Sequence, residues 1–336
     1  MSNLSMGDLA ANFQMRIYAN QTRSEMMRLA AEVTTGLKSD IGKEVAGDFT
    51  AYSGIERGLR VVAAYKTTNV EVETLFGAAQ SVLNNVQEKG QNITSALLTA
   101  QSAEDFTLMD ATGENARQQF SAVVSNLNTQ LSHRSIFSGA ATDRPSLASG
   151  ADMLDELVIA TAGLTTASDV SDAVDAWFDD VGGGFETMGY LGSQNHLGPM
   201  SIADDETAQL DIRADDPEIR DFLKGFAKAA LVGRDVLSGD VAETAELMGT
   251  AASELINNDG DITGLRTRIG TTQERIETAQ ARIEAERSTY EMARNDLLAA
   301  DPYETATALQ DVYAQMEALY TITARLAGLK FTDYIR

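Results

Sequence analysis

Residues 262–297 read ITGLRTRIGTTQERIETAQARIEAERSTYEMARNDL, and one spacing within them decides the fold. Apolar residues recur every seven positions without a slip, at Ile262, Ile269, Ile276, Ile283, Tyr290 and Leu297. A heptad repeat of this length predicts a helix of roughly 55 Å, at about 1.5 Å per residue, lying along another helix that covers its apolar seam. An ordinary compact domain does not accommodate such a helix, so the sequence predicts a rod.

The sequence on both sides of this stretch predicts the partner helices. Helices are expected over 9–35, 48–101 and 105–131 in the N-terminal half, and over 242–256 and 303–329 in the C-terminal half. Each has apolar residues at alternating spacings of three and four. Gly36 suits the end of the first helix, Pro217 restarts helix after the middle of the chain, and Pro302 separates the last two helices. The short break at 102–104 predicts an antiparallel hairpin.

Residues 140–216 have a different texture from the rest of the chain. They contain the only tryptophan, Trp177, and the run Gly182 to Gly184. Short helices are expected over 152–160 and 168–180, and short strands over 190–191, 200–202 and 209–213. This segment is predicted to be a small α+β insert.

The predicted fold class is therefore mainly α: a long antiparallel helical bundle or coiled-coil rod built from the N- and C-terminal segments, with a small α+β domain inserted at its distal end. Three domains are expected. The terminal assembly helices comprise 1–40 and 301–336, the helical rod domain comprises 41–139 and 217–300, and the acidic insert comprises 140–216.

Charge limits the classes of partner. The formal net charge of the 336 residues is -24, which disfavours binding to nucleic acid or to anionic lipid. From 141 to 221 there are 18 acidic residues against three arginines, whereas acids and bases cancel in residues 1–40. A neutral N-terminal segment suits the close packing of identical copies, because like charges without partners repel.

The sequence contains no cysteine and no recognisable targeting signal, which limits the kinds of site and the cellular location that can be expected. With no cysteine, a disulfide framework, a thiolate metal site and a cysteine nucleophile are excluded. No basic segment followed by an apolar one begins the chain, and no run reaches the ~18 apolar residues that span a membrane. A cytoplasmic protein is expected unless it leaves by a route that uses another kind of signal.

The sequence offers no convergent catalytic or cofactor constellation, so no enzyme activity, cofactor or metal is expected. His133 and His196 have no metal-ligand spacing, and Gly42-Lys43 lacks the other residues of a P-loop. The carboxylates at 204–206 and 215–216 leave a calcium or ligand module open as an alternative, although their spacing matches no known loop.

The terminal helices carry the predicted functional residues, which are subunit contacts. Their apolar stripes consist largely of Ala, Thr and Met, so we expect these helices to fold only when neighbours cover them. The expected contact residues are Met15, Met26, Leu29, Val33, Leu309, Val312, Met316, Leu319, Leu326 and Leu329.

Three segments resemble the bacterial flagellin superfamily. Residues 32–38, EVTTGLK, resemble a Ser-Thr-Gly-Lys/Leu signature at the end of the family's first helix. Residues 135–139, SIFSG, with Thr142 and Pro145, resemble a Tyr-Ile-Phe-Ala/Ser-Gly segment of its hook–filament junction branch. Residues 309–310, 319–320, 326–329 and 334–336 resemble its closing helix and tail. The basic final residue, Arg336, is more like some filament flagellins, so a filament subunit remains the alternative.

The resemblance covers roughly 1–145 and 217–336, and it implies a structural role without catalysis. It implies export through the flagellar type III apparatus without a cleaved signal peptide, an extracellular location on the flagellum, and assembly at the tip of the hook. The implied partners are other copies of the chain in a ring, a neighbouring hook-associated protein, flagellin and an export chaperone.

Overall fold

The computed structural model describes residues 6–334, and the side chains of residue 10 and of residues 13–325. The chain forms two compact units. Unit 1 comprises residues 1–63 and 284–336, and unit 2 comprises residues 64–283. The predicted division into three domains stays a prediction.

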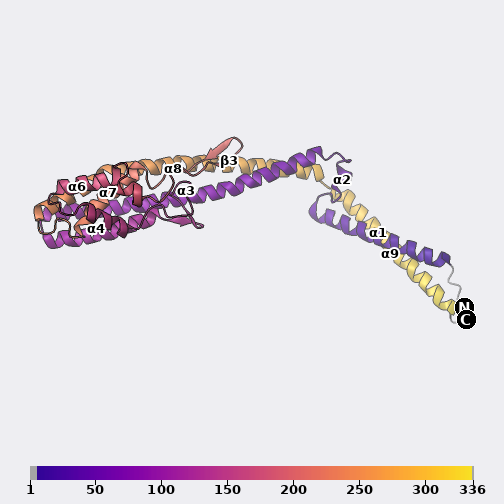
Figure 1. Ribbon diagram of the computed structural model, residues 1–336. Helices are drawn as coiled ribbons and strands as arrows, with labels where there is room; N and C mark the ends of the chain where they lie inside the picture. Colours follow the sequence, from indigo (N-terminus) through magenta and orange to yellow (C-terminus); the bar gives the residue numbers. More distant parts are fainter. Residues whose placement is uncertain (1–5, 335–336) are drawn as a thin grey trace. The chain divides into compact units, whose positions relative to one another are not determined.

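The described chain is mainly α, with long helices that pack on one another and two small sheets, as the sequence predicted. Figure 1 shows the order of the elements. The N-terminal half contains α1 (Met6–Thr35), α2 (Ile41–Glu44), α3 (Thr50–Ala103), α4 (Phe106–Leu127), β1 (Gln130–Leu131) and β2 (Arg134–Ser135). The middle contains α5 (Gly150–Ala160), α6 (Ala167–Asp179), the π-helical turn η1 (Phe185–Gly189), β3 (Met200–Ala203) and β4 (Glu206–Ala208). The C-terminal half contains α7 (Pro217–Val232), α8 (Val241–Leu298) and α9 (Pro302–Tyr334).

The heptad seam of α8 is buried in unit 2. Ile262, Ile269, Ile276 and Ile283 are each at most 2% exposed, and so are Val72, Phe76, Leu83 and Val86 on α3. The Gln87 side chain joins the two helices, since it donates to Asp259 and accepts from Arg266. The predicted pairing of long helices is therefore confirmed.

The stretches predicted to be helical over 242–256 and 262–297 belong to one helix, α8, which runs from Val241 to Leu298. Leu255 in the first stretch and Ile262 in the second are both buried. Continuous packing therefore outweighs the low helix propensity of the Asn, Asp and Gly residues at 257–260.

Helices α4 and α7 pack closely because glycines face each other. A Cβ atom added to Gly113 of α4 would lie 2.5 Å from the backbone nitrogen of Gly233, which follows α7. The rings of Phe222 and Phe226 on α7 make an edge-on contact, and both rings are buried. The core of unit 2 lies between these helices, α3 and α8.

Within unit 2, the insert has a small core of its own. Trp177, Phe178 and Phe185 form an aromatic cluster between α6 and η1. Lys228 of α7 is fully buried and forms ion pairs with Asp175 of α6 and Glu254 of α8, so one cation joins three helices.

Three details of the predicted strands and helix ends are wrong. Helix α4 ends at Leu127, and a hairpin with a turn at Ser132 and His133, both at positive φ, occupies 130–135. Residues 209–213 form no strand, and the preceding strand β4 ends at Ala208. Tyr190 makes only an isolated bridge to Leu147. Strands of two to four residues carry too little pattern to be located from sequence.

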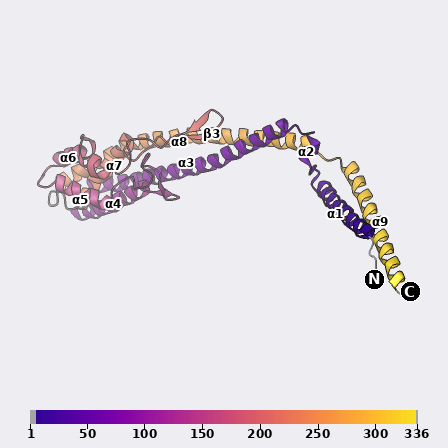
Figure 2. The ribbon, with the colours of Figure 1, turned by 45° about the vertical axis from the view of Figure 1, so that its right-hand side comes forward.

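In unit 1, α1 and α9 pack against each other, as Figures 1 and 2 show. The first turns of α3 also approach the end of α8. Tyr290 of α8 lies over Gly58 of α3, where an added Cβ atom would be 2.5 Å from the tyrosine ring. Among the described residues, no helix is long and apolar enough to cross a membrane.

Candidate functional site

The terminal helix pair of unit 1 carries the predicted contact residues, and their exposure differs. Leu29, Val312 and Met316 are buried in the single chain. Met15, Met26, Leu309 and Leu319 are half-buried, Val33 is 44% exposed, and Leu326 and Leu329 lie outside the side chains that the structure describes. The stripe of α1 is therefore covered by α9 in part, and its role in subunit contact stays a prediction.

A second set of apolar residues on the same two helices was missed by the sequence analysis. These large side chains are exposed: Phe13, Ile17, Tyr18 and Met27 on α1, and Tyr303, Tyr313, Tyr320 and Ile322 on α9. Phe13, Ile17 and Met27 recur at helical spacing on the side of α1 opposite Leu29, so α1 is apolar on two faces. The helical spacing of these three residues is the sequence signal that could have revealed them. We call these eight side chains the exposed apolar set.

The joint between α1 and α9 is built from two short extended segments. Residues 36–38, which follow α1, run antiparallel to residues 298–300, which precede α9, and Leu37 lies opposite Ala299. The Lys38 amide donates to the Leu298 carbonyl at 2.8 Å, and the Ala300 amide donates to the Gly36 carbonyl at 2.9 Å. Gly36 has a φ of +71°, which allows the chain to turn out of the helix.

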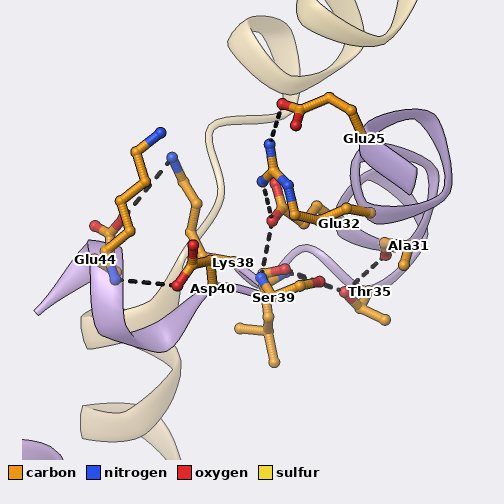
Figure 3. Close-up of polar contacts among 11 residues, drawn as sticks. Glu25, Ala31, Glu32, Thr35, Lys38, Ser39, Asp40 and Glu44 are labelled. Atoms are coloured by element: carbon orange, nitrogen blue, oxygen red, sulfur yellow. Dashed lines mark hydrogen bonds and ion pairs between the residues drawn. The ribbon is translucent and has the colours of Figure 1, made fainter. Parts of the chain in front are cut away.

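Glu32 anchors this joint to α1 and is only 2% exposed. Its carboxylate Oε1 accepts from the Arg28 guanidinium at 2.7 Å and from the Ser39 amide at 2.9 Å. Arg28 also donates to Glu25 at 2.6 Å. Figure 3 shows these contacts. The hydrogen bond to Glu25, followed by that to Glu32, raises the pKa of Arg28, so the guanidinium stays charged.

A cleft of about 340 Å³ lies beside the joint. Its lining includes Arg28 and Glu32 of α1, Lys38 of the segment that follows α1, Glu44 of α2 and Glu304 of α9. Lys38 and Glu44 approach to 3.9 Å, so most of these charges already have a partner within the chain.

The residues weighed for metal binding are apart or engaged elsewhere. His133 and His196 are both exposed. Asp215 and Asp216 face Arg213, at 2.8 Å and 3.8 Å. Asp205 has a positive φ in the turn between β3 and β4. Within residues 6–334 as described, no group of three or more potential ligands is placed to hold a metal ion.

The segment 135–139 supports the fold rather than presenting a surface. Ile136, Phe137 and Ser138 are buried, and the Phe137 carbonyl accepts from the Ala214 amide. Gly139 has a φ of +60°, and an added Cβ atom would lie 2.3 Å from the Asn195 carbonyl oxygen. The segment thus packs against the residues through which the chain leaves the insert.

Comparison with known proteins gives one sequence match and a shared fold. Residues 253–335 match the family described as the bacterial flagellin C-terminal helical region. The crystal structure of FlgL from Bacillus cereus has a TM-score of 0.51 and 14% identity, and the match covers 71% of this chain and 97% of that one. A structure described as a flagellar hook-associated protein from Vibrio parahaemolyticus has a TM-score of 0.49 and 13% identity, covering 72% and 94%. No curated protein matches the chain.

Proposed function

We propose that this chain, whose C-terminal helices are flagellin-like and whose fold is that of FlgL, is a structural subunit of the bacterial flagellum that joins the hook to the filament. The flagellin C-terminal match includes all of α9, and the helix that α9 packs on is α1. The proposed activity is therefore assembly by the terminal helices, without catalysis.

One observation carries this proposal: the terminal pair leaves large apolar side chains in water. Phe13 is 67% exposed, Tyr320 is 62% exposed and Ile322 is 53% exposed. A soluble monomer rarely exposes a large apolar patch unless the patch meets a partner. Packing of many copies around a ring covers one such patch on every subunit, because identical subunits repeat one contact.

The proposed partners follow from a position between two other assemblies. Copies of the chain form a ring, a hook-associated protein lies on one side, and flagellin lies on the other. The subunit reaches the outside of the cell unfolded, through the flagellar type III apparatus, and an export chaperone holds it before that. The lack of cysteine supports this route, since no disulfide has to be opened before transit.

The alternative function is that of a filament flagellin, because the matched C-terminal region is described as flagellin in general. The two functions differ in what the purified protein does alone. A junction subunit is expected to stay short of long polymers, whereas a filament flagellin polymerises into long filaments. Electron microscopy of the purified protein at increasing concentration distinguishes them.

Deletion of the gene tests the proposal directly. We expect hooks without filaments, with flagellin released into the medium, and recovery of filaments on complementation with the wild-type gene. Electron microscopy and analysis of the culture medium give both readouts. Filaments that persist unchanged in the deletion strain would refute the junction function.

A further inference from the structure

The seam between α1 and α9 specifies their axial alignment only weakly. Among the side chains described on the two helices, its buried apolar members are Leu29 on α1 and Val312 and Met316 on α9, and its other predicted members are half-buried or exposed. A helix surface nearly repeats every seven residues, so sliding one helix along the other replaces a contact with a similar one. Some other feature must fix the alignment of the two helices.

Glu32 binds both ends of the connector that leaves α1. Its backbone carbonyl accepts from the Gly36 amide at 2.8 Å, and its buried carboxylate accepts from the Ser39 amide at 2.9 Å. Residues 36–38 between these two points pair with 298–300, and α9 begins at Pro302. The path from Glu32 to the first turn of α9 is therefore short and hydrogen-bonded throughout.

We propose that Glu32 sets the axial register of α1 against α9. A carboxylate buried without partners is costly, and the Ser39 amide is, with Arg28, one of the two donors that Glu32 has. Fixing register is the best-attested use of buried polar groups between helices. The exposed apolar set is drawn from both helices, so its members keep one arrangement relative to one another only in one register. This last step alone rests on the proposed function.

Cysteine crosslinking measures the register directly, because the chain has no cysteine of its own. A Met26→Cys substitution is combined, in three separate full-length variants, with Leu309→Cys, Val312→Cys or Met316→Cys. These three positions follow one another along one side of α9. In dilute monomer under mild oxidation, we expect one pair to crosslink roughly tenfold faster than the others, which corresponds to a single dominant register.

Glu32→Leu is then added to each pair, since leucine has a similar size but accepts no hydrogen bond. We expect the three crosslinking rates to come within about threefold of one another, as several registers become populated. Glu25→Leu is the matched control: Glu25 accepts from the same Arg28, whereas Glu32 also accepts from the Ser39 amide, so this variant should keep the single fast pair. Glu32→Gln, which retains an acceptor for Ser39, should keep it too.

Two outcomes would overturn the proposal. One is that the Glu32→Leu variants still crosslink fastest through the same single cysteine pair. The other is the loss of all three crosslinks, which would make Glu32 necessary for pairing rather than for register. Fluorescence of Trp177, which lies in unit 2, checks that each variant is folded there. The measurement uses the monomer, so it stands even if the deletion strain keeps its filaments and the proposed function fails.

Discussion

At the scale of single residues, buried charges in this protein serve to join elements. Lys228 is fully buried and has Asp175 and Glu254 within ion-pair distance. The other oxygen of Glu254, Oε2, is buried without a hydrogen-bond partner. Burial raises the pKa of Glu254 above its usual value of 4.5, and Lys228 only partly offsets this effect. A charged Glu254 is therefore held in a site that disfavours its charge.

This arrangement predicts a pH dependence. The folded state binds the Glu254 proton more tightly than the unfolded chain does, so its contribution to stability is complete below pH 4.5 and is lost as pH rises through the raised pKa. As pH rises from 4.5 through the raised pKa, the free energy of unfolding of the wild type should fall relative to that of Glu254→Gln. Urea titrations of both proteins at several pH values, followed by Trp177 fluorescence, measure this. Parallel pH profiles for the two proteins would contradict it.

At the scale of elements, glycine decides how closely α4 approaches α7. We predict that Gly113→Ala destabilises unit 2 by about 1–3 kcal/mol, because the added methyl group meets backbone rather than a movable side chain. Gly77→Ala in α3 is the matched control, since nothing lies within 4 Å of its added Cβ atom. That change should stabilise by about 0.5–1 kcal/mol. Thermal unfolding of the two variants compares them, and an equal gain in both would show that helix propensity, not contact, dominates.

One exposed and one buried apolar residue of α9 predict different phenotypes. Tyr320→Asp changes an exposed side chain, so monomer stability should shift by no more than about 0.5 kcal/mol while attachment of filaments is lost. Met316→Asp places a carboxylate in the seam and should open the pair itself. Hydrogen exchange of the α1 amides and electron microscopy of complemented deletion strains separate the two effects. Normal filaments with Tyr320→Asp would exclude Tyr320 from the assembly contact.

The long elements could be predicted from the sequence, and the joint could not. The heptads from Ile262 onward are a repeated local signal, and they lie where the pattern indicated. Glu32 looked like an ordinary helical glutamate because its partner Ser39 depends on a turn, and the bridge from Leu37 to Ala299 joins segments far apart in the chain. Periodicity also favoured one stripe on α1 and missed the face with Phe13, since it does not say which of two apolar faces a partner covers.

At the scale of the whole molecule, the two units have unequal cores. The largest fully buried side chains, among them Phe76, Phe120, Phe222 and Phe226, all belong to unit 2. The buried apolar residues described in unit 1 are fewer and smaller, such as Leu29, Val62 and Val312. Local stability follows the density of buried contacts, so unit 1 should open at lower free energy.

We therefore predict two separable unfolding transitions. Helix content, measured by far-UV circular dichroism, should begin to fall while Trp177 fluorescence still reports a folded unit 2. Limited proteolysis should likewise first trim residues 1–35 and 305–336. Coincident transitions by both probes, with both ends protected in a verified monomer, would show that the molecule unfolds as one cooperative body.

The pairing of α1 with α9 also determines the order in which the protein can be completed. Helix α1 ends at Thr35, and its partner α9 begins at Pro302, so residues 36–301 separate them along the chain. During synthesis, or during passage through any narrow pore, α1 stays unpaired until α9 has emerged. A truncated chain has an unpaired α1, and only a finished molecule presents both helices together.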